Sequence, residues 1–261
     1  MRYLFIFLLT SSAYASEIVQ TVAGQRATGY LGLGKNPKYS EEVFDTNDLP
    51  ELFDWRFSGM VTPVRDQAQC GSCVSMAATK VFESALMIQG GYEEFNLAEQ
   101  EMLSCRKGDA NGCSGAYMTA PAYMSVHGQG LEKDFPYRAQ NLACKKIPVV
   151  AKASSYKLLG SSNRKPTILE IKAALIKYGP LVVTAYAGGP GWSGKTGKIT
   201  SCRKTNSTNH AITLIGYDKT GFIFRNSWSS NWGNKGDSWI GYGCDGFANE
   251  AGYYTIDPIE E

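Results

Sequence analysis

The cysteines restrict this chain more than any other feature of its sequence. There are seven of them, and they stand at Cys70, Cys73, Cys105, Cys113, Cys144, Cys202 and Cys244. Cysteines pair in an oxidising compartment, so an odd number leaves at least one thiol over. Three disulfides and one free thiol are the simplest arrangement. A free thiol in such a place is either buried and inert or present to react.

The N-terminus indicates that the chain enters such a compartment. Arg2 supplies a positive charge, residues 3–9 are apolar, and Ala13-Tyr14-Ala15 is a small-x-small cleavage site. A membrane anchor needs ~20 apolar residues, and this run is far shorter. We therefore expect residues 1–15 to be a signal peptide, although a buried strand is the alternative. The mature protein is expected to be secreted, periplasmic or lysosome-like in location.

Composition excludes several classes of protein. The 261 residues suffice for one large domain or for two small ones that share a cleft. The chain is 43% hydrophobic and 19% charged, which is ordinary for a soluble protein. A net charge of +2 without runs of like charge favours neither nucleic acid nor a membrane surface as a partner. We expect a monomer.

Residues 16–48 differ from the rest of the chain. Four glycines interrupt any helical period, and acidic residues cluster before Leu49-Pro50. We interpret this stretch as an extended, atypical pro-segment. The alternative is a structured N-terminal part of the following domain.

The remaining chain predicts an α+β protein with two lobes. In the first lobe, residues 49–155, a strong helix runs from Cys73 until Gly90-Gly91, and further helices are expected around residues 97–105 and 118–127. In the second, residues 156–261, a capping box at Thr167 opens one helix. Short β-rich runs follow at 181–187, 211–217, 221–225 and 253–256. A functional site is expected in the cleft between the lobes.

Cys73 has the surroundings of a nucleophile. It begins a helix, where unpaired N–H groups and the positive end of the helix dipole favour the thiolate. The spacing Cys70-Gly71-Ser72-Cys73 also fits a redox pair, but no βαβ unit is visible around it. A zinc site formed with Cys105 and Cys113 is a further alternative, although their spacing is unsuitable. We expect no metal and no cofactor.

A cysteine nucleophile needs a base, and the chain contains two histidines. His127 follows the third expected helix and is interpreted as an exposed or capping residue. His210 opens an apolar strand, and Asn226 lies across the next turn, where its amide oxygen can orient the imidazole. A regular hairpin would place the two side chains on opposite faces of the sheet. We therefore predict a bulge or a loop of different length.

These motifs resemble the papain family of cysteine peptidases, which includes the cathepsins. In that family, Cys-Gly-Ser/Ala-Cys is followed by His and Asn ~130–150 residues downstream. The resemblance runs from Leu49 to the C-terminus. It includes Asp54-Trp55-Arg56, Val61-Thr62-Pro63-Val64, Gln67, Gly112-Cys113, Pro136-Tyr137, Asn209-His210-Ala211, Asn226-Ser227-Trp228 and Trp232-Gly233.

The resemblance implies specific roles for individual residues. It makes Cys73 the nucleophile, His210 the base and later the acid, and Asn226 the residue that orients the imidazole. Gln67 and the Cys73 backbone N–H would form the oxyanion hole, and Trp228 would shield the His–Asn hydrogen bond. The implied disulfides are Cys70–Cys113, Cys105–Cys144 and Cys202–Cys244. The implied two-lobed fold combines a helical N-terminal lobe with an antiparallel, β-barrel-like C-terminal lobe.

The sequence departs from the family pattern in several places. Val74 stands where an aromatic residue is expected, and the family's paired glycines appear as Gly115 and Ala116. The usual helical pro-region is not expected, although an extended segment that covers the cleft would still keep a zymogen latent. By analogy of position, substrate is expected to contact Gly115, Ala116, Tyr117, Met118, Thr184, Asn209, Ala211, Trp228 and Asn249. Because we find no charge in this set, an apolar or modest substrate side chain is expected.

The expected activity is hydrolysis of peptide bonds in peptides or proteins, through a thioester on Cys73. No insertion resembles the loops of exopeptidases, so an endopeptidase is favoured. A catalytically silent binding protein is one alternative, and Val74 is the feature that favours it. A transpeptidase that uses the same thioester is another. Asn206-Ser207-Thr208 is a glycosylation sequon if the source organism glycosylates.

Overall fold

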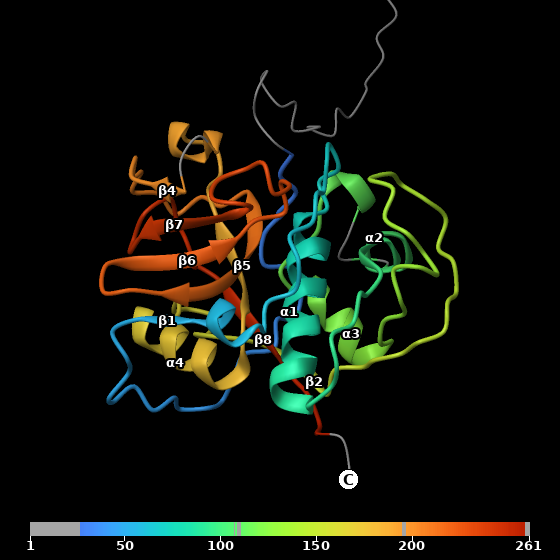
Figure 1. Ribbon diagram of the computed structural model, residues 1–261, viewed down its shortest axis with the longest axis horizontal. Helices are drawn as coiled ribbons and strands as arrows, with labels where there is room; N and C mark the ends of the chain where they lie inside the picture. The colour runs from blue at the N-terminus through green and yellow to red at the C-terminus, as the bar shows by residue number, and fades with distance from the viewer. Residues whose placement is uncertain (1–26, 107, 109–110, 195–196, 259–261) are drawn as a thin grey trace, which may run out of the picture.

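The computed structural model describes residues 27–106, 108, 111–194 and 197–258. The expected signal peptide and residues 16–26 of the expected pro-segment lie outside these ranges. The described chain forms two lobes, with helix α1 (Cys73–Gly90) between them (Figure 1). None of its helices combines the length and the apolar content needed to cross a membrane.

Helix α1 begins and ends where the sequence predicts. Gly91 follows it in the left-handed conformation, with φ of 69°, and its N–H donates to the Leu86 carbonyl. The helix is buried along nearly its whole length because both lobes pack against it. A central buried helix gives the thiol at its first residue a rigid support.

The helical lobe contains α2 (Glu99–Cys105), the short 3-10 helices η2 (Gly112–Ser114) and η3 (Ala120–Ala122), and α3 (Tyr123–Val126). The helix expected around residues 118–127 is therefore much shorter than predicted. Pro121 stands in a 3-10 turn, and Gly128 ends the helix with φ of +74°. Two disulfides, Cys70–Cys113 and Cys105–Cys144, connect the loops of this lobe.

The second lobe is built on one sheet with the order β2-β8-β3-β5-β6-β7-β4. Its strands are β2 (Ser155–Leu158), β3 (Leu181–Ala185), β4 (Lys198–Ile199), β5 (His210–Tyr217), β6 (Gly221–Arg225), β7 (Asp237–Gly241) and β8 (Ala251–Thr255), and β1 (Phe53–Asp54) pairs with β5. All pairs are antiparallel except β4 with β7. The sheet is open, with β2 and β4 at its ends, so the expected barrel-like closure is not found. The sequence missed β1, β2, β4 and β7, which are short or lie between glycine-rich turns.

Helix α4 (Ile168–Tyr178) packs on this sheet, and the 3-10 helices η1 (Trp55–Ser58) and η4 (Pro190–Ser193) flank it. The predicted capping box is present. Thr167 accepts a hydrogen bond from the Glu170 N–H, and the Glu170 carboxylate accepts one from the Thr167 N–H. The third disulfide, Cys202–Cys244, also lies in this lobe, and all three pairs are those that the family resemblance implied.

The hairpin of β5 and β6 contains the predicted irregularity. Thr213 pairs with Arg225 and Leu214 with Phe224, but the register shifts between Leu214 and Gly216. One extra residue in β5 therefore moves the side chains at the start of that strand to the opposite face of the sheet. His210 consequently faces the same side of the sheet as Asn226.

Candidate active site

Cys73 is the one free cysteine of the described residues, and it is fully buried. Burial raises the pKa of its thiol to about 12. The backbone N–H groups of Ala211, Val74 and Gly29, and that of Cys73 itself, act in the opposite direction. Ala211 follows His210 in β5, so the thiol and the strand that carries the histidine meet in the cleft. In this state, the thiol keeps its proton.

His210 is held by Asn226 in a defined tautomer. Its Nε2 lies 2.8 Å from the Asn226 Oδ1 atom, and the same oxygen accepts a hydrogen bond of 2.8 Å from the Ser227 N–H. A backbone N–H can only donate, so the amide oxygen of Asn226 must point toward Ser227 and His210. His210 therefore donates from Nε2. Its Nδ1 is left as the basic nitrogen, buried and without a hydrogen bond to any described residue.

Aromatic residues exclude water from this pair. The Trp228 ring stacks on the imidazole with 4.7 Å between ring centres, and Trp192 approaches it edge-on. Both His210 and Trp228 are almost completely buried. Burial lowers the pKa of His210 to about 4, although the hydrogen bond to Asn226 acts in the opposite direction. The imidazole is therefore neutral in this state.

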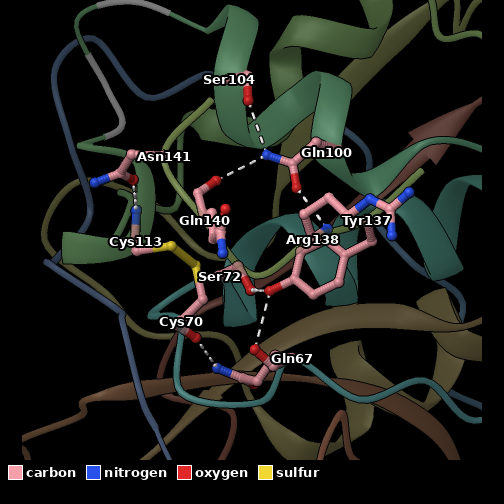
Figure 2. Close-up of a disulfide and its surroundings, with 10 residues drawn as sticks. All are labelled: Gln67, Cys70, Ser72, Gln100, Ser104, Cys113, Tyr137, Arg138, Gln140 and Asn141. Atoms are coloured by element: carbon pink, nitrogen blue, oxygen red, sulfur yellow. Dashed lines mark hydrogen bonds between the residues drawn. A yellow bond between two sulfur atoms is a disulfide. The ribbon is translucent and has the colours of Figure 1, made fainter. Parts of the chain in front are cut away.

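The Gln67 side chain is held in a fixed orientation by two hydrogen bonds. Its Nε2 donates to the Cys70 carbonyl at 2.9 Å, and its Oε1 accepts from the Ser227 hydroxyl at 2.6 Å (Figure 2 shows the first contact). These partners fix which end of the amide is nitrogen. One of the two N–H bonds of Nε2 is used by Cys70, so the other is left for a ligand. The side chain is fully buried.

The first described residues of the expected pro-segment run between the two lobes, and the residues that follow pass along the second lobe (Figure 1, blue). Trp228 donates from Nε1 to the Ala27 carbonyl, and the Asn209 carbonyl accepts from the N–H groups of Gly29 and Tyr30. On the opposite side, the segment pairs in parallel with Ala116. The Ala116 N–H donates to the Gly29 carbonyl at 2.8 Å, and its carbonyl accepts from the Leu31 N–H at 3.0 Å.

Gly29 passes unusually close to the active-site backbone. A Cβ atom at this position would lie 2.0 Å from the Gly71 carbonyl oxygen, so only glycine fits. The Gly29 N–H, which donates to the Asn209 carbonyl, also lies close enough to the Cys73 sulfur to favour the thiolate, and the Gly29 carbonyl accepts a hydrogen bond from the Ala116 N–H. The segment therefore passes over the buried thiol and is hydrogen-bonded to the main chain on both sides of it.

Gly115 and Ala116 occupy the positions of the family's paired glycines, and they differ in backbone conformation. Gly115 has a φ of +120°, and a Cβ there would lie 2.5 Å from the Gly29 carbonyl oxygen. Ala116 does not adopt a positive φ, so its methyl group is tolerated. Beyond it, Met118 donates from its N–H to the Gly32 carbonyl at 2.9 Å. These expected substrate-binding residues all contact the segment.

The side chain of Tyr30 fills a pocket beside the thiol. It belongs to one buried cluster with Met118, Ala116 and Ala211. Burial raises the pKa of its phenol, and the nearby Glu250 carboxylate raises it further. Glu250 accepts a hydrogen bond of 2.5 Å from the Thr184 hydroxyl and forms no ion pair among the described residues. Thr184 was expected at the pocket from the sequence but Glu250 was not, and the Glu250 carboxylate adds a charge that the expectation of an uncharged pocket did not include.

Other expected residues have less direct roles. Asn249 binds the Asn206 carbonyl at the rim of the cleft, and Tyr117 lies beside Gly32 of the segment. His127 is exposed and stacks on Tyr123, far in sequence from any catalytic group. No group of His, Cys, Asp and Glu residues in the described chain has the arrangement of a metal site.

A thiol at a helix N-terminus and an imidazole fixed by an amide are the groups that acyl-transferring cysteine nucleophiles use. The sequence model of the family described as papain family cysteine protease matches residues 49–255. The chain belongs to this family, and it is a cysteine-type peptidase that acts on peptides or proteins.

Relatives of known sequence and structure agree with this assignment. Cysteine proteinase 2 of Entamoeba histolytica is 34% identical over 224 residues, which cover 79% of this chain and 70% of the relative. Cathepsin K of Gallus gallus is 31% identical over 233 residues, 85% of this chain and 67% of the relative. A recombinant stem bromelain precursor superimposes with a TM-score of 0.77 at 28% identity and covers 89% of this chain and 78% of its own. A Carica candamarcensis cysteine protease in complex with E-64 superimposes with a TM-score of 0.69 at 26% identity. The match covers 80% of this chain and 99% of that protease.

Proposed function

We propose that this protein is an endopeptidase in which Cys73 is the nucleophile and His210 is the base. The observation that carries the proposal is the fixed orientation of Asn226, which leaves Nδ1 of His210 as the basic nitrogen. Nδ1 takes the proton of the Cys73 thiol, and the thiolate attacks the peptide carbonyl carbon. The endopeptidase assignment is supported by the sequence, in which no insertion next to Gln67 or in the helical lobe resembles the loops of exopeptidases.

The remaining groups act on the intermediate. Negative charge develops on the carbonyl oxygen, and the free N–H of Gln67 and the backbone N–H of Cys73 stabilise it. The imidazolium then gives its proton to the leaving amine, and a thioester remains on Cys73. Water attacks this thioester while Nδ1 accepts a proton, which releases the acid product and regenerates the thiol. Attack by an amine in place of water would give the transpeptidase alternative.

Labelling with an epoxide inhibitor of cysteine peptidases tests this assignment, because the chain carries a matched control. We expect peptide mapping to find the label on Cys73 once the cleft is open. His210→Ala should slow labelling and lower kcat by about 10²–10⁴-fold, the range of a lost general base. His127→Ala should change neither. Equal effects of the two histidine substitutions, or an unlabelled Cys73, would favour the catalytically silent protein.

The pro-segment is proposed to keep the enzyme latent. Support comes from its hydrogen bonds across the cleft and from the buried thiol beneath it. After the cleft, the segment follows the second lobe, where Glu42 pairs with Lys177 at 2.6 Å and Phe44 packs edge-on against Tyr178 and Tyr253. Residues between these contacts and Leu49 are exposed and are therefore the proposed place of cleavage.

The pocket occupied by Tyr30 is proposed to select the substrate side chain. Its walls are apolar, but Glu250 supplies one half-buried carboxylate without a basic partner among the described residues. Removal of Tyr30 would expose this carboxylate to the substrate. Lysine or arginine side chains are therefore preferred there over acidic ones, and a tyrosine hydroxyl is also accepted.

An extracytoplasmic location and a monomeric state complete the proposal. The location is supported by the three disulfides.

A further inference from the structure

One hydroxyl group contacts both segments that form the oxyanion hole. The Tyr137 phenol donates a hydrogen bond of 3.0 Å to the Gln67 carbonyl and lies 2.5 Å from the Ser72 hydroxyl (Figure 2). Ser72 immediately precedes Cys73, whose N–H is the second proposed oxyanion donor. Tyr137 thus connects the loop of one donor to the residue before the other.

The direction of these hydrogen bonds follows from the number of protons available. A phenol has a single O–H, and Tyr137 uses it for the Gln67 carbonyl, which can only accept. The Ser72 hydroxyl must therefore donate to the Tyr137 oxygen. Burial raises the pKa of the phenol, the hydrogen bond with Ser72 lowers it by less, and the Glu99 and Asp66 carboxylates add smaller effects that raise it. The phenol keeps its proton across the working range of a peptidase.

This contact gives Ser72 an unusual role for its position. Ser72 is the N-cap residue of α1, yet its side chain caps no backbone N–H. A serine at an N-cap normally accepts a hydrogen bond from an N–H of the first helical turn. Here those N–H groups belong to the residues that face the sulfur, because the Val74 and Cys73 N–H groups lie close enough to favour the thiolate. A capping hydroxyl would compete with the sulfur for them.

The loop that carries Tyr137 is itself fixed. The Tyr137 N–H donates to the Glu132 carboxylate at 2.7 Å, and the Arg138 N–H donates to the Gln100 side chain of α2 at 2.9 Å (Figure 2 shows the second contact). Gln100 also donates to the Gln140 carbonyl at 3.0 Å. The hydroxyl therefore has a defined place relative to α1, which a mobile loop could not give it.

We propose that Tyr137 is a positioning residue, which holds the Gln67 loop and turns the Ser72 hydroxyl away from the first turn of α1. The backbone N–H groups of that turn then remain available to the thiolate and to the oxyanion. The inference rests on the proposed role of Cys73 and adds a residue that acts through Gln67 and Ser72. It concerns the transition state and the thiolate, and it predicts little effect on substrate binding.

Tyr137→Phe tests the proposal in the full chain, folded and then nicked within the exposed part of residues 40–48. We expect kcat to fall about tenfold with KM within about twofold. The pH profile of Cys73 alkylation by iodoacetamide should shift to higher pH, because the freed Ser72 hydroxyl caps the helix. Adding Ser72→Ala to Tyr137→Phe should restore the alkylation profile but not kcat, since Gln67 stays unsupported.

Tyr92→Phe is the matched control, because the Tyr92 hydroxyl forms no hydrogen bond among the described residues of the same lobe. It should leave kcat, KM and the alkylation profile unchanged. An unchanged kcat and profile in Tyr137→Phe would overturn the proposal. A lower melting temperature with a profile that Ser72→Ala does not restore would also overturn it, by showing a merely structural role. Wild-type protein without alkylation at Cys73 would instead refute the proposed function.

Discussion

Ser227 orients two side-chain amides at once. Its N–H binds the Asn226 oxygen, and its hydroxyl donates to the Gln67 oxygen. The first contact sets the tautomer of His210, and the second fixes which end of the Gln67 amide is nitrogen. One residue thus orients both the proposed base and a proposed oxyanion donor through the direction of its hydrogen bonds.

Glu250→Gln tests the residue that gives the substrate pocket its charge. The substitution keeps the shape and the hydrogen bond to Thr184 but removes the negative charge. We expect kcat/KM for peptides with arginine at the pocket position to fall about tenfold, equivalent to about 1.4 kcal/mol, while leucine peptides change less than twofold. Asp218→Asn, far from the cleft in the β5–β6 turn, is the control. Equal losses for both peptides would contradict the assignment of Glu250.

At the same scale, residue type, order and spacing led to Cys73, His210 and Asn226 as the proposed nucleophile, base and orienting amide. The structure confirms the free thiol and the contact between His210 and Asn226. Glu250 and Tyr137 were not identified as functional, because their roles depend on how two loops pass the cleft. Nothing in the local pattern around Asn249-Glu250 distinguishes which of the two faces the pocket.

Among the elements, the β5–β6 hairpin shows how function limits local structure. A regular hairpin would separate His210 from Asn226, so a register shift was predicted and is present. The helix around residues 118–127 was overpredicted because Pro121 favours a 3-10 turn. Composition set residues 16–48 apart from the rest of the chain and suggested a pro-segment, but it did not give the path of their described part. That path depends on main-chain pairing with Ala116 and Asn209, which carries no side-chain signal.

Gly29→Ala tests the pro-segment as an inhibitory element. The new Cβ would collide with backbone, which cannot move aside as a flexible side chain would. Overpacking of this kind typically costs about 1–3 kcal/mol, so we expect Cys73 in the intact chain to be labelled at least about fivefold faster. Val43→Ala changes a residue of the same segment that is 94% exposed and should have no effect. Unchanged labelling of Gly29→Ala would show that the segment does not control access.

The described chain contains two hydrophobic cores, one that includes α1 and the N-terminal residue Tyr30, and one that lies within the second lobe. The lobes are also connected below the cleft, where the Gln89 amide of α1 donates to the Tyr178 and Tyr254 carbonyls. The two-lobed arrangement followed from the change of pattern along the sequence. The burial of Cys73 and His210 did not, because it depends on how Trp228, Trp192 and the N-terminal segment pack around them.

This burial makes occlusion dependent on pH in two directions. The occluded state lowers the pKa of His210 from 6.5 to about 4, so it is favoured above pH 6.5 and loses stability as the pH falls toward 4. It also raises the pKa of Cys73 from 9.0 to about 12, so it is favoured below pH 9.0 and loses stability as the pH rises toward 12. Occlusion is therefore strongest between these windows.

The rate of Cys73 labelling in the intact chain, divided by the rate in the nicked chain at the same pH, measures this effect. Because both rates depend in the same way on the intrinsic reactivity of the thiolate, their ratio depends on access to Cys73. We expect the ratio to be lowest near neutral pH and to rise by up to about tenfold per pH unit below 6.5, the limit for one proton. The Glu42–Lys177 pair adds to the rise only below pH 4.5, because its hydrogen bonds lower the pKa of Glu42 despite partial burial. A ratio that stays flat from pH 4.5 to pH 8 would show that the pro-segment does not bury His210.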